Sequence, residues 1–215
     1  MPQFVDADTI GAGTTKIRLS GIDAPESDQR CLDSHGQLWS CGLQATSSLR
    51  AYSGNRPWTC ELNGFDRYGR RLGTCSVQGV DIGRWLVRNG WALAYRRYST
   101  AYVEDEDYAR EHQLGLWSGA FIAPWDWRHR DRRTVVLGAL TVPITAQAEL
   151  LAPASAAQAP SPSCTNKGNV NRRGERIYHL PGSVDYAMVN MAAPEKRWFC
   201  TEDEAKAAGW RPARR

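Results

Sequence analysis

Six cysteines constrain this chain more than any other feature of its sequence. They fall into three local pairs, and none has the CxxC spacing that a zinc site favours. We therefore expect three disulfides and an oxidising compartment, so that the protein is secreted or periplasmic. No signal peptide precedes Met1, and we expect an N-terminus that was processed, trimmed or misassigned. The cysteines are Cys31, Cys41, Cys60, Cys75, Cys164 and Cys200.

The second cysteine pair lies in a predicted β-hairpin. Two strands, Pro57–Leu62 and Arg71–Val77, are joined by the turn-rich sequence NGFDRYGR. Cys60 and Cys75 would then lie near opposite positions of the two strands. That placement suits a cross-strand disulfide, because such bonds prefer a Cα separation of about 5.5 Å.

The remaining patterns predict a mixture of strands and helices. Acids open the helix at Glu104–Leu114 and bases close it, which matches the helix dipole. Asp81 is a predicted N-cap for a helix through Val87. We expect an α+β fold in which helices pack around a small barrel. The other predicted elements are strands at Lys16–Ile22 and Trp91–Tyr95 and a helix at Gly42–Ala51.

Charge gives little information about function. The net charge is +4, but the basic excess lies outside residues 1–127. No stretch reaches the roughly 20 apolar residues that a membrane-spanning helix needs. A nucleic-acid partner therefore has to be argued from a site and not from bulk charge.

Four acids and two arginines form the candidate site. The acids lie at the ends of neighbouring strands, where antiparallel pairing could bring them together. Clustered carboxylates repel one another unless a cation joins them, and hard cations such as calcium prefer oxygen ligands. Arginine can bind phosphate through two hydrogen bonds. Taken singly, each residue could equally be a turn cap or a surface ion pair. The residues are Asp6, Asp8, Asp23, Glu26, Arg18 and Arg70.

Taken together, these motifs resemble the staphylococcal nuclease family. The resemblance covers about residues 1–127 and implies an OB-fold-like five-stranded β-barrel with packed helices. It also implies a calcium-dependent phosphodiesterase that hydrolyses DNA and RNA and leaves 3′-phosphate ends. The motifs are DADT at Asp6–Thr9, RLSGIDAPE at Arg18–Glu26, DRYGRRL at Asp66–Leu72, GWALAY at Gly90–Tyr95 and LGLW at Leu114–Trp117.

The resemblance also implies a role for each site residue. Asp8 and Asp23 match calcium-binding carboxylates, with the backbone carbonyl of Ala24 as a further ligand. Asp6 matches a supporting acid, and Glu26 matches the residue that positions or activates the attacking water. Arg18 and Arg70 match the arginines that bind the phosphate and stabilise its transition state. Tyr95 and Tyr98 lie where the family has nucleotide-contacting tyrosines.

Two features depart from the family pattern, and a third agrees with its exported members. Ala7 stands where the family commonly has glycine, and would strain the loop if that position needed a positive φ. Only residues 1–5 precede Asp6, so the family's long first strand is nearly absent. A Cys31–Cys41 disulfide, as in exported members of the family, would tether the loop that carries Asp23 and Glu26.

The rest of the chain is predicted to be a linker and a small second module. Residues 128–163 are basic, then apolar, then rich in Ala, Pro and Ser, and we expect a poorly ordered or loosely docked linker. Residues 164–215 resemble an α+β module often appended to such nucleases. Thr201 and Glu204 form a capping box, and a Cys164–Cys200 disulfide would stabilise the module. Its basic face, with Arg172, Arg173, Arg176, Arg211, Arg214 and Arg215, could contact anionic surfaces weakly or simply be solvated.

Two other functions remain open. The first is a catalytically inactive OB-type nucleic-acid-binding module, although decayed domains usually lose the acids or arginines that are present here. The second is an anchoring protein that acts through the C-terminal module. We expect DNA and RNA as substrates, no stable protein partner and a monomer.

Overall fold

The computed structural model describes residues 3–130, 133–143, 145–152, 159, 164–171, 174–189, 191 and 196–213. The chain divides into two compact units, Met1–Pro153 and Ala154–Arg215. The first unit therefore continues well beyond residue 127, where we expected the first domain to end.

The larger sheet of the first unit has strand order β1-β2-β3-β8-β7, with β9 paired to β8. Its pairings are antiparallel except for the parallel pairing of β3 with β8. Buried residues alternate along β8, so one face of the sheet lies on the core. The strands are β1 (Gln3–Phe4), β2 (Thr9–Ala12), β3 (Thr15–Leu19), β7 (Trp58–Phe65), β8 (Arg71–Val77) and β9 (Val80–Asp81).

The β7–β8 hairpin confirms the predicted cross-strand disulfide. Cys60 lies directly opposite Cys75 in the register, and the two are bonded. Asp66 organises the turn, because its side chain accepts the backbone N–H groups of Tyr68 and Arg70. The other two expected disulfides, Cys31–Cys41 and Cys164–Cys200, are formed as well.

Two smaller sheets hold the segments that follow β3. One pairs β4 with β10, and the other has the order β12-β11-β5-β6. Strands of two or three residues have no detectable period, which is why sequence patterning missed most of them. They are β4 (Ile22–Asp23), β5 (Cys31–Leu32), β6 (Leu38–Trp39), β10 (Leu93–Ala94), β11 (Ala120–Ile122) and β12 (Val136–Gly138).

The longer helices follow the sequence prediction. Asp81 caps α2 as expected, by accepting the N–H of Arg84 at 3.2 Å. The first turn of α3 is acidic and its last turn carries Arg110. The helices of this unit are α1 (Cys41–Ser53), α2 (Ile82–Arg88), α3 (Val103–Glu111), η1 (Gly115–Ser118), α4 (Pro124–His129) and α5 (Ala146–Leu151).

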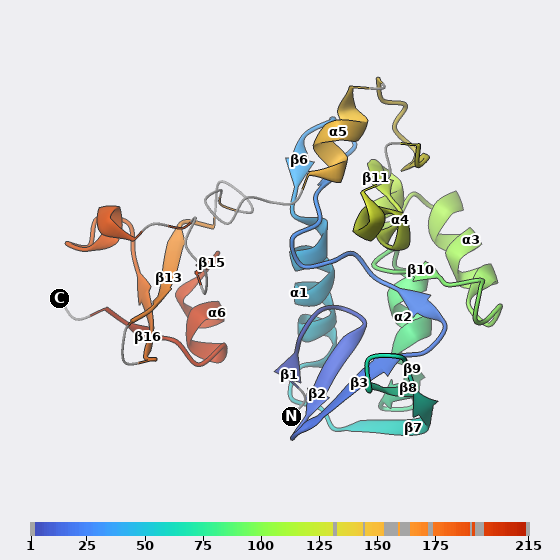
Figure 1. The fold of residues 1–215 in the computed structure, drawn as a ribbon, viewed down its shortest axis with the longest axis horizontal. Coiled ribbons are helices and arrows are strands. Elements are labelled where there is room, and N and C mark those ends of the chain that lie inside the picture. Colours follow the sequence, from blue (N-terminus) through green and yellow to red (C-terminus); the bar gives the residue numbers. More distant parts are fainter. Residues whose placement is uncertain are drawn as a thin grey trace. The chain divides into compact units, whose positions relative to one another are not determined.

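The main core lies between the larger sheet and helices α1 and α2. Ile10, Leu49 and Leu86 are almost completely buried there, and Phe4 of the short strand β1 packs against them. Ala7 is buried in the same core and is not among the described non-glycine residues with positive φ. Alanine at this position therefore brings no backbone strain. In Figure 1, α1 lies beside β1 and β2, whereas β6, β11, α4 and α5 gather at the other end of the unit.

The residues after α4 are not the loosely docked linker that we expected. All three residues of β12 pair with β11, and α5 buries Leu150 and Leu151 in a cluster with Trp127. The apolar run thus completes the core around the small sheet, because packing there removes its leucines and valines from water. The Ala/Pro/Ser-rich residues 153–163 lie outside the described residues, except for Ala159.

The second unit is a small α+β module, with strand order β15-β13-β14-β16. Thr201 and Glu204 form the predicted cap: the Thr201 hydroxyl accepts the Glu204 N–H at 3.0 Å, and the Glu204 carboxylate accepts the Cys200 N–H at 2.8 Å. The basic residues Arg172, Arg173, Arg214 and Arg215 lie outside the described residues. The elements are β13 (Asn166–Val170), β14 (Arg176–His179), η2 (Tyr186–Met188), β15 (Arg197–Phe199), α6 (Glu202–Ala207) and β16 (Arg211–Pro212).

The α+β fold class is confirmed. The pairing of the larger sheet runs as an open path from β1 to β7, and the closed barrel stays a prediction. Within the described residues, no helix combines the length and the apolar character that crossing a membrane requires.

Candidate active site

Asp8 and Arg18 meet because β2 and β3 form an antiparallel pair. The register places Thr9 opposite Arg18, so Asp8 lies just beyond the paired end of β2. The backbone carbonyl of Asp8 accepts the N–H of Leu19 at 2.8 Å, which fixes this end of the pair. The guanidinium of Arg18 donates to Oδ1 of Asp8 and to Oδ1 of Asp23. Arg18 therefore bridges the two carboxylates that we expected to bind calcium.

Asp23 reaches this point at the end of β4. Antiparallel pairing with β10 sets it opposite Leu93, and its side chain is fully buried. The next residue, Ala24, donates its backbone N–H to Oδ2 of Asp8 at 2.7 Å. Asp8 thus holds the start of the loop that leads to Glu26.

Burial disfavours the negative charge of both acids. Desolvation raises the pKa of Asp8 to about 7, although Arg18 opposes the rise and Asp6 adds to it. Desolvation and the charge of Asp8 together raise the pKa of Asp23 above its usual range, against the bonds from arginine. Each carboxylate is therefore a poor anion by itself, and a bound cation would stabilise both charges.

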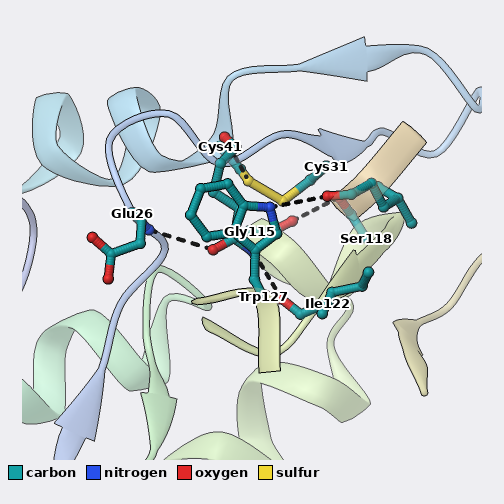
Figure 2. The surroundings of a disulfide bond; sticks show 9 residues. Glu26, Cys31, Cys41, Gly115, Ser118, Ile122 and Trp127 are labelled. Carbon is teal, nitrogen blue, oxygen red and sulfur yellow. Dashed lines mark hydrogen bonds between the residues drawn. A yellow bond between two sulfur atoms is a disulfide. The ribbon is translucent and has the colours of Figure 1, made fainter. Parts of the chain in front are cut away.

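Glu26 lies on the loop between β4 and β5, and its side chain is 30% exposed. Gln29 is fully buried and holds this loop from inside. The amide of Gln29 accepts the Glu26 N–H at 3.4 Å and donates to the Ile122 carbonyl of β11 at 2.7 Å. Figure 2 shows the backbone nitrogen of Glu26 on the side toward the Cys31–Cys41 disulfide, while its carboxylate points away from the disulfide. The loop backbone is fixed and the carboxylate faces outward.

Helix α1 packs directly against the same loop. A Cβ at Gly42 would lie 1.7 Å from the carbonyl oxygen of Glu26, so the approach requires glycine. The disulfide joins Cys31, the first residue of β5, to Cys41, the first residue of α1. The loop is thus held by β4 at its start and by the disulfide at its end.

A third arginine, which the sequence analysis missed, completes the cluster. Arg128 of α4 donates to Oδ2 of Asp23 at 2.6 Å and to Oε1 of Glu26 at 2.7 Å. Burial disfavours the charge of Arg128, but these bonds outweigh it and raise its pKa above the ordinary arginine value. The sequence analysis missed it because Arg128 is the first residue of the segment that we expected to be a linker, residues 128–163.

Arg70 lies elsewhere in its own turn. Its Nε donates to Oδ2 of Asp66 at 2.6 Å, and its guanidinium lies 5.5 Å from the ring centre of Tyr68. Across the described chain, no hydrogen bond or ion pair joins Arg70 to Asp8, Asp23 or Glu26. The structure therefore brings five of the expected polar residues and Arg128 into contact with one another and leaves Arg70 on the hairpin. The five are Asp6, Asp8, Arg18, Asp23 and Glu26.

The remaining expected residues lie around this centre. Oδ1 of Asp6 accepts the backbone N–H of Asp8 at 3.1 Å, so Asp6 supports the loop. Tyr95 stacks on Trp125 of α4 with ring centres 5.3 Å apart, and Tyr98 meets Tyr95 edge-on at 5.0 Å. The ring of Tyr98 is largely exposed. These aromatic rings could stack with nucleic-acid bases.

The donor set fits a hard cation that water helps to coordinate. Among the described residues, no group of three or more His, Cys, Asp or Glu side chains could hold a metal ion. Calcium, however, takes about six to eight oxygen ligands, which include backbone carbonyls and water. Two adjacent buried carboxylates whose pKa values are raised are a partial set of that kind.

A sequence model described as "Staphylococcal nuclease homologue" matches residues 16–119. This range includes Arg18, Asp23, Glu26 and Arg70, whereas Asp8 precedes it and Arg128 follows it.

Individual relatives extend the match. The chain is 38% identical over 116 residues to the succinoglycan biosynthesis protein ExoI of Rhizobium meliloti, a match that covers 53% of this chain and 61% of that protein. It is 35% identical over 136 residues to an uncharacterized endonuclease of Escherichia coli O157:H7, covering 60% of this chain and 82% of the relative. It is 31% identical over 148 residues to the micrococcal nuclease of Shigella flexneri, covering 60% and 79% respectively.

Proposed function

Because this chain belongs to the staphylococcal nuclease family, we propose that it is a calcium-dependent endonuclease that hydrolyses DNA and RNA and leaves 3′-phosphate ends. Family membership and the endonucleases among its relatives support phosphodiester hydrolysis. The observation that carries the proposal is the bridge from Arg18 to the buried pair Asp8 and Asp23, with Glu26 beside it at the surface.

Each group in the centre has a chemical task under this proposal. Asp8, Asp23 and the Ala24 carbonyl hold calcium, and bound calcium supplies Lewis-acid polarisation of the phosphoryl oxygens. Glu26 is exposed enough to orient a water molecule for attack and to accept a proton from that water.

Arg18 and Arg70 are the arginines expected to bind the phosphate. In the transition state they stabilise the negative charge that develops on the phosphate. Arg18 lies between the two acids, where it can turn from them to the phosphate. Arg70 is bonded to Asp66 in the β7–β8 turn and would have to leave that partner to reach the phosphate. Loss of either arginine is expected to raise the barrier by about 3 kcal/mol, which is roughly a hundredfold in rate.

The proposal also covers the barrel, the oligomeric state and the location of the protein. We infer an OB-type barrel in the first unit and a monomeric protein. Three disulfides suit an oxidising environment, which supports a secreted or periplasmic location.

The test is hydrolysis of heat-denatured DNA and of single-stranded RNA by the purified protein, with calcium and with EGTA. We expect cleavage with calcium only, and almost none by Glu26→Gln. Arg110→Gln, which changes an exposed residue of α3, should cleave like the parent protein. Treatment with a 3′-phosphatase should shift the mobility of the 5′-labelled products.

A negative result would separate the alternatives. Protein that is folded by circular dichroism and binds an oligonucleotide without cutting it would support a catalytically inactive binding module. Cleavage that persists in EGTA would contradict the proposed metal dependence.

A further inference from the structure

Arg128 connects the proposed calcium ligand Asp23 to Glu26, the carboxylate proposed to activate water. Its Nη2 donates to Oδ2 of Asp23 at 2.6 Å, and its Nη1 reaches Oδ1 of Asp23 at 3.2 Å and Oε1 of Glu26 at 2.7 Å. The contact with Asp23 is therefore bidentate, the stronger of the usual arginine–carboxylate geometries. The side chain of Arg128 is 35% exposed, whereas that of Asp23 is fully buried.

Helix α4 is anchored so that Arg128 faces the acids. Trp127 is buried, and its indole N–H donates to the Leu150 carbonyl of α5 at 3.0 Å. On the helix side that carries Arg128, Trp125 stacks on Tyr95 with only 7° between the ring planes. Residues 125 and 128 are one helical turn apart and share a face. The position of Arg128 is thus fixed by packing on both sides.

Arg128 occupies oxygen atoms that a cation would also need. Oδ1 of Asp23 accepts from both Arg18 and Arg128, and Oδ2 accepts from Arg128. A calcium ion binds carboxylate oxygen at about 2.3–2.6 Å, which leaves little room for a guanidinium on the same lone pairs. Binding of calcium to Asp23 therefore has to weaken or break the Arg128–Asp23 contact. The contact with Glu26 uses a different acceptor and can persist.

On the basis of the function proposed above, we propose that Arg128 is a positioning residue that competes with calcium for Asp23 and keeps Glu26 oriented once calcium has bound. Removal of the guanidinium then has two opposite effects. Calcium binds more tightly, because a competing positive charge has gone. Catalysis slows, because Glu26 loses the partner that orients its carboxylate.

Calorimetric titration of calcium into the full chain, cleared with EGTA and dialysed, tests the first effect. We expect Arg128→Gln to bind calcium at least about threefold more tightly than the parent protein. Arg128→Lys keeps one positive charge without the bidentate geometry and should fall between them. Arg110→Gln removes an arginine that pairs with Asp107 on α3, and it should leave calcium affinity unchanged.

Kinetics on a single-stranded oligonucleotide at saturating calcium test the second effect. Arg128→Gln should lower kcat about tenfold or more and leave KM within about twofold, since the loss lies in the chemical step. Arg128→Lys should recover part of kcat. A purely structural role would not couple a lower kcat to a tighter calcium site.

The outcomes separate this inference from the proposed function. If the parent protein binds calcium and cleaves, but both Arg128 variants bind calcium equally or more weakly, the competition is overturned and the function stands. If the parent protein neither binds calcium nor cleaves, both proposals fail. Should Arg128→Gln not fold, the calcium affinity of Arg128→Lys decides the question alone.

Discussion

At the scale of single residues, Arg18 supplies the positive charge that pairs with both buried carboxylates of the centre. Its side chain is 13% exposed and bonds to two buried carboxylates. We expect Arg18→Met, which keeps the volume, to lower the free energy of unfolding by about 3 kcal/mol, because it removes the cation from a buried cluster. Urea unfolding of Arg18→Met and of the parent protein, both in EGTA, measures this difference in free energy.

A surface arginine gives the matched comparison for this variant. Arg84 is 58% exposed and lies 3.3 Å from Asp105, so Arg84→Met should cost less than about 1 kcal/mol. Equal stability of Arg18→Met and the parent protein would show that the buried acids do not depend on this guanidinium.

Gln29 has no proposed catalytic role, but its replacement should lower both stability and activity. Its amide satisfies the Glu26 N–H and the Ile122 carbonyl inside the protein. We expect Gln29→Leu to destabilise the fold by about 2 kcal/mol, since it removes the side-chain partner of the buried Ile122 carbonyl and of the partly buried Glu26 N–H. It should also lower kcat, because the Glu26 loop is no longer held. Gln37→Leu, at an exposed position, should change neither quantity.

The sequence predicts those site residues that are close to one another along the chain and misses the one that is distant. Asp8, Arg18, Asp23 and Glu26 come from neighbouring strands, so local motifs placed them correctly together. Arg128 is far from them in sequence and reaches them from a helix of only six residues. A helix of that length has too few turns for its pattern to indicate which face meets the site.

At the scale of elements, the loop between β4 and β5 depends on the Cys31–Cys41 disulfide. Two disulfides of the first unit close short segments, with sequence separations of 10 and 15 residues. Loop entropy therefore predicts a similar loss of stability, about 3 kcal/mol, when either is replaced by two alanines. Only the Cys31→Ala/Cys41→Ala variant should also lower kcat and speed hydrogen exchange in residues 24–31.

The hairpin disulfide is the internal control for that experiment. The Cys60→Ala/Cys75→Ala variant loosens β7 and β8 and should leave exchange in residues 24–31 unchanged. If the two double variants had the same effect on kcat, tethering of the catalytic loop would not be the reason for it.

The elements also show where sequence patterns stop being informative. Strand β8 and helices α1, α2 and α3 follow period and capping signals, and their observed bounds lie close to the predicted ones. Strands β5, β6 and β12 have two or three residues and exist because tertiary pairing supplies their hydrogen bonds. Their positions depend on partners far away in the sequence.

At the scale of the whole molecule, the apolar segment after α4 belongs to the first unit. Its composition resembled a linker, but Leu150 and Leu151 are buried against α4 and β11. Each buried leucine contributes roughly 2 kcal/mol. A domain is stable by only about 5–15 kcal/mol, so the loss of this segment should affect the entire unit.

Three truncated chains test where the nuclease unit ends. Residues 1–153 should fold and keep kcat within about twofold of the full chain, since they contain all of the first unit. Residues 1–130 retain Arg128 but lose β12 and α5, including the Leu150 carbonyl that anchors Trp127. Residues 1–127 lose Arg128 as well. We expect the melting temperature to fall sharply for both shorter chains. If residues 1–127 proved as stable and as active as residues 1–153, the segment after α4 would be dispensable, and the positioning role of Arg128 would fall with it.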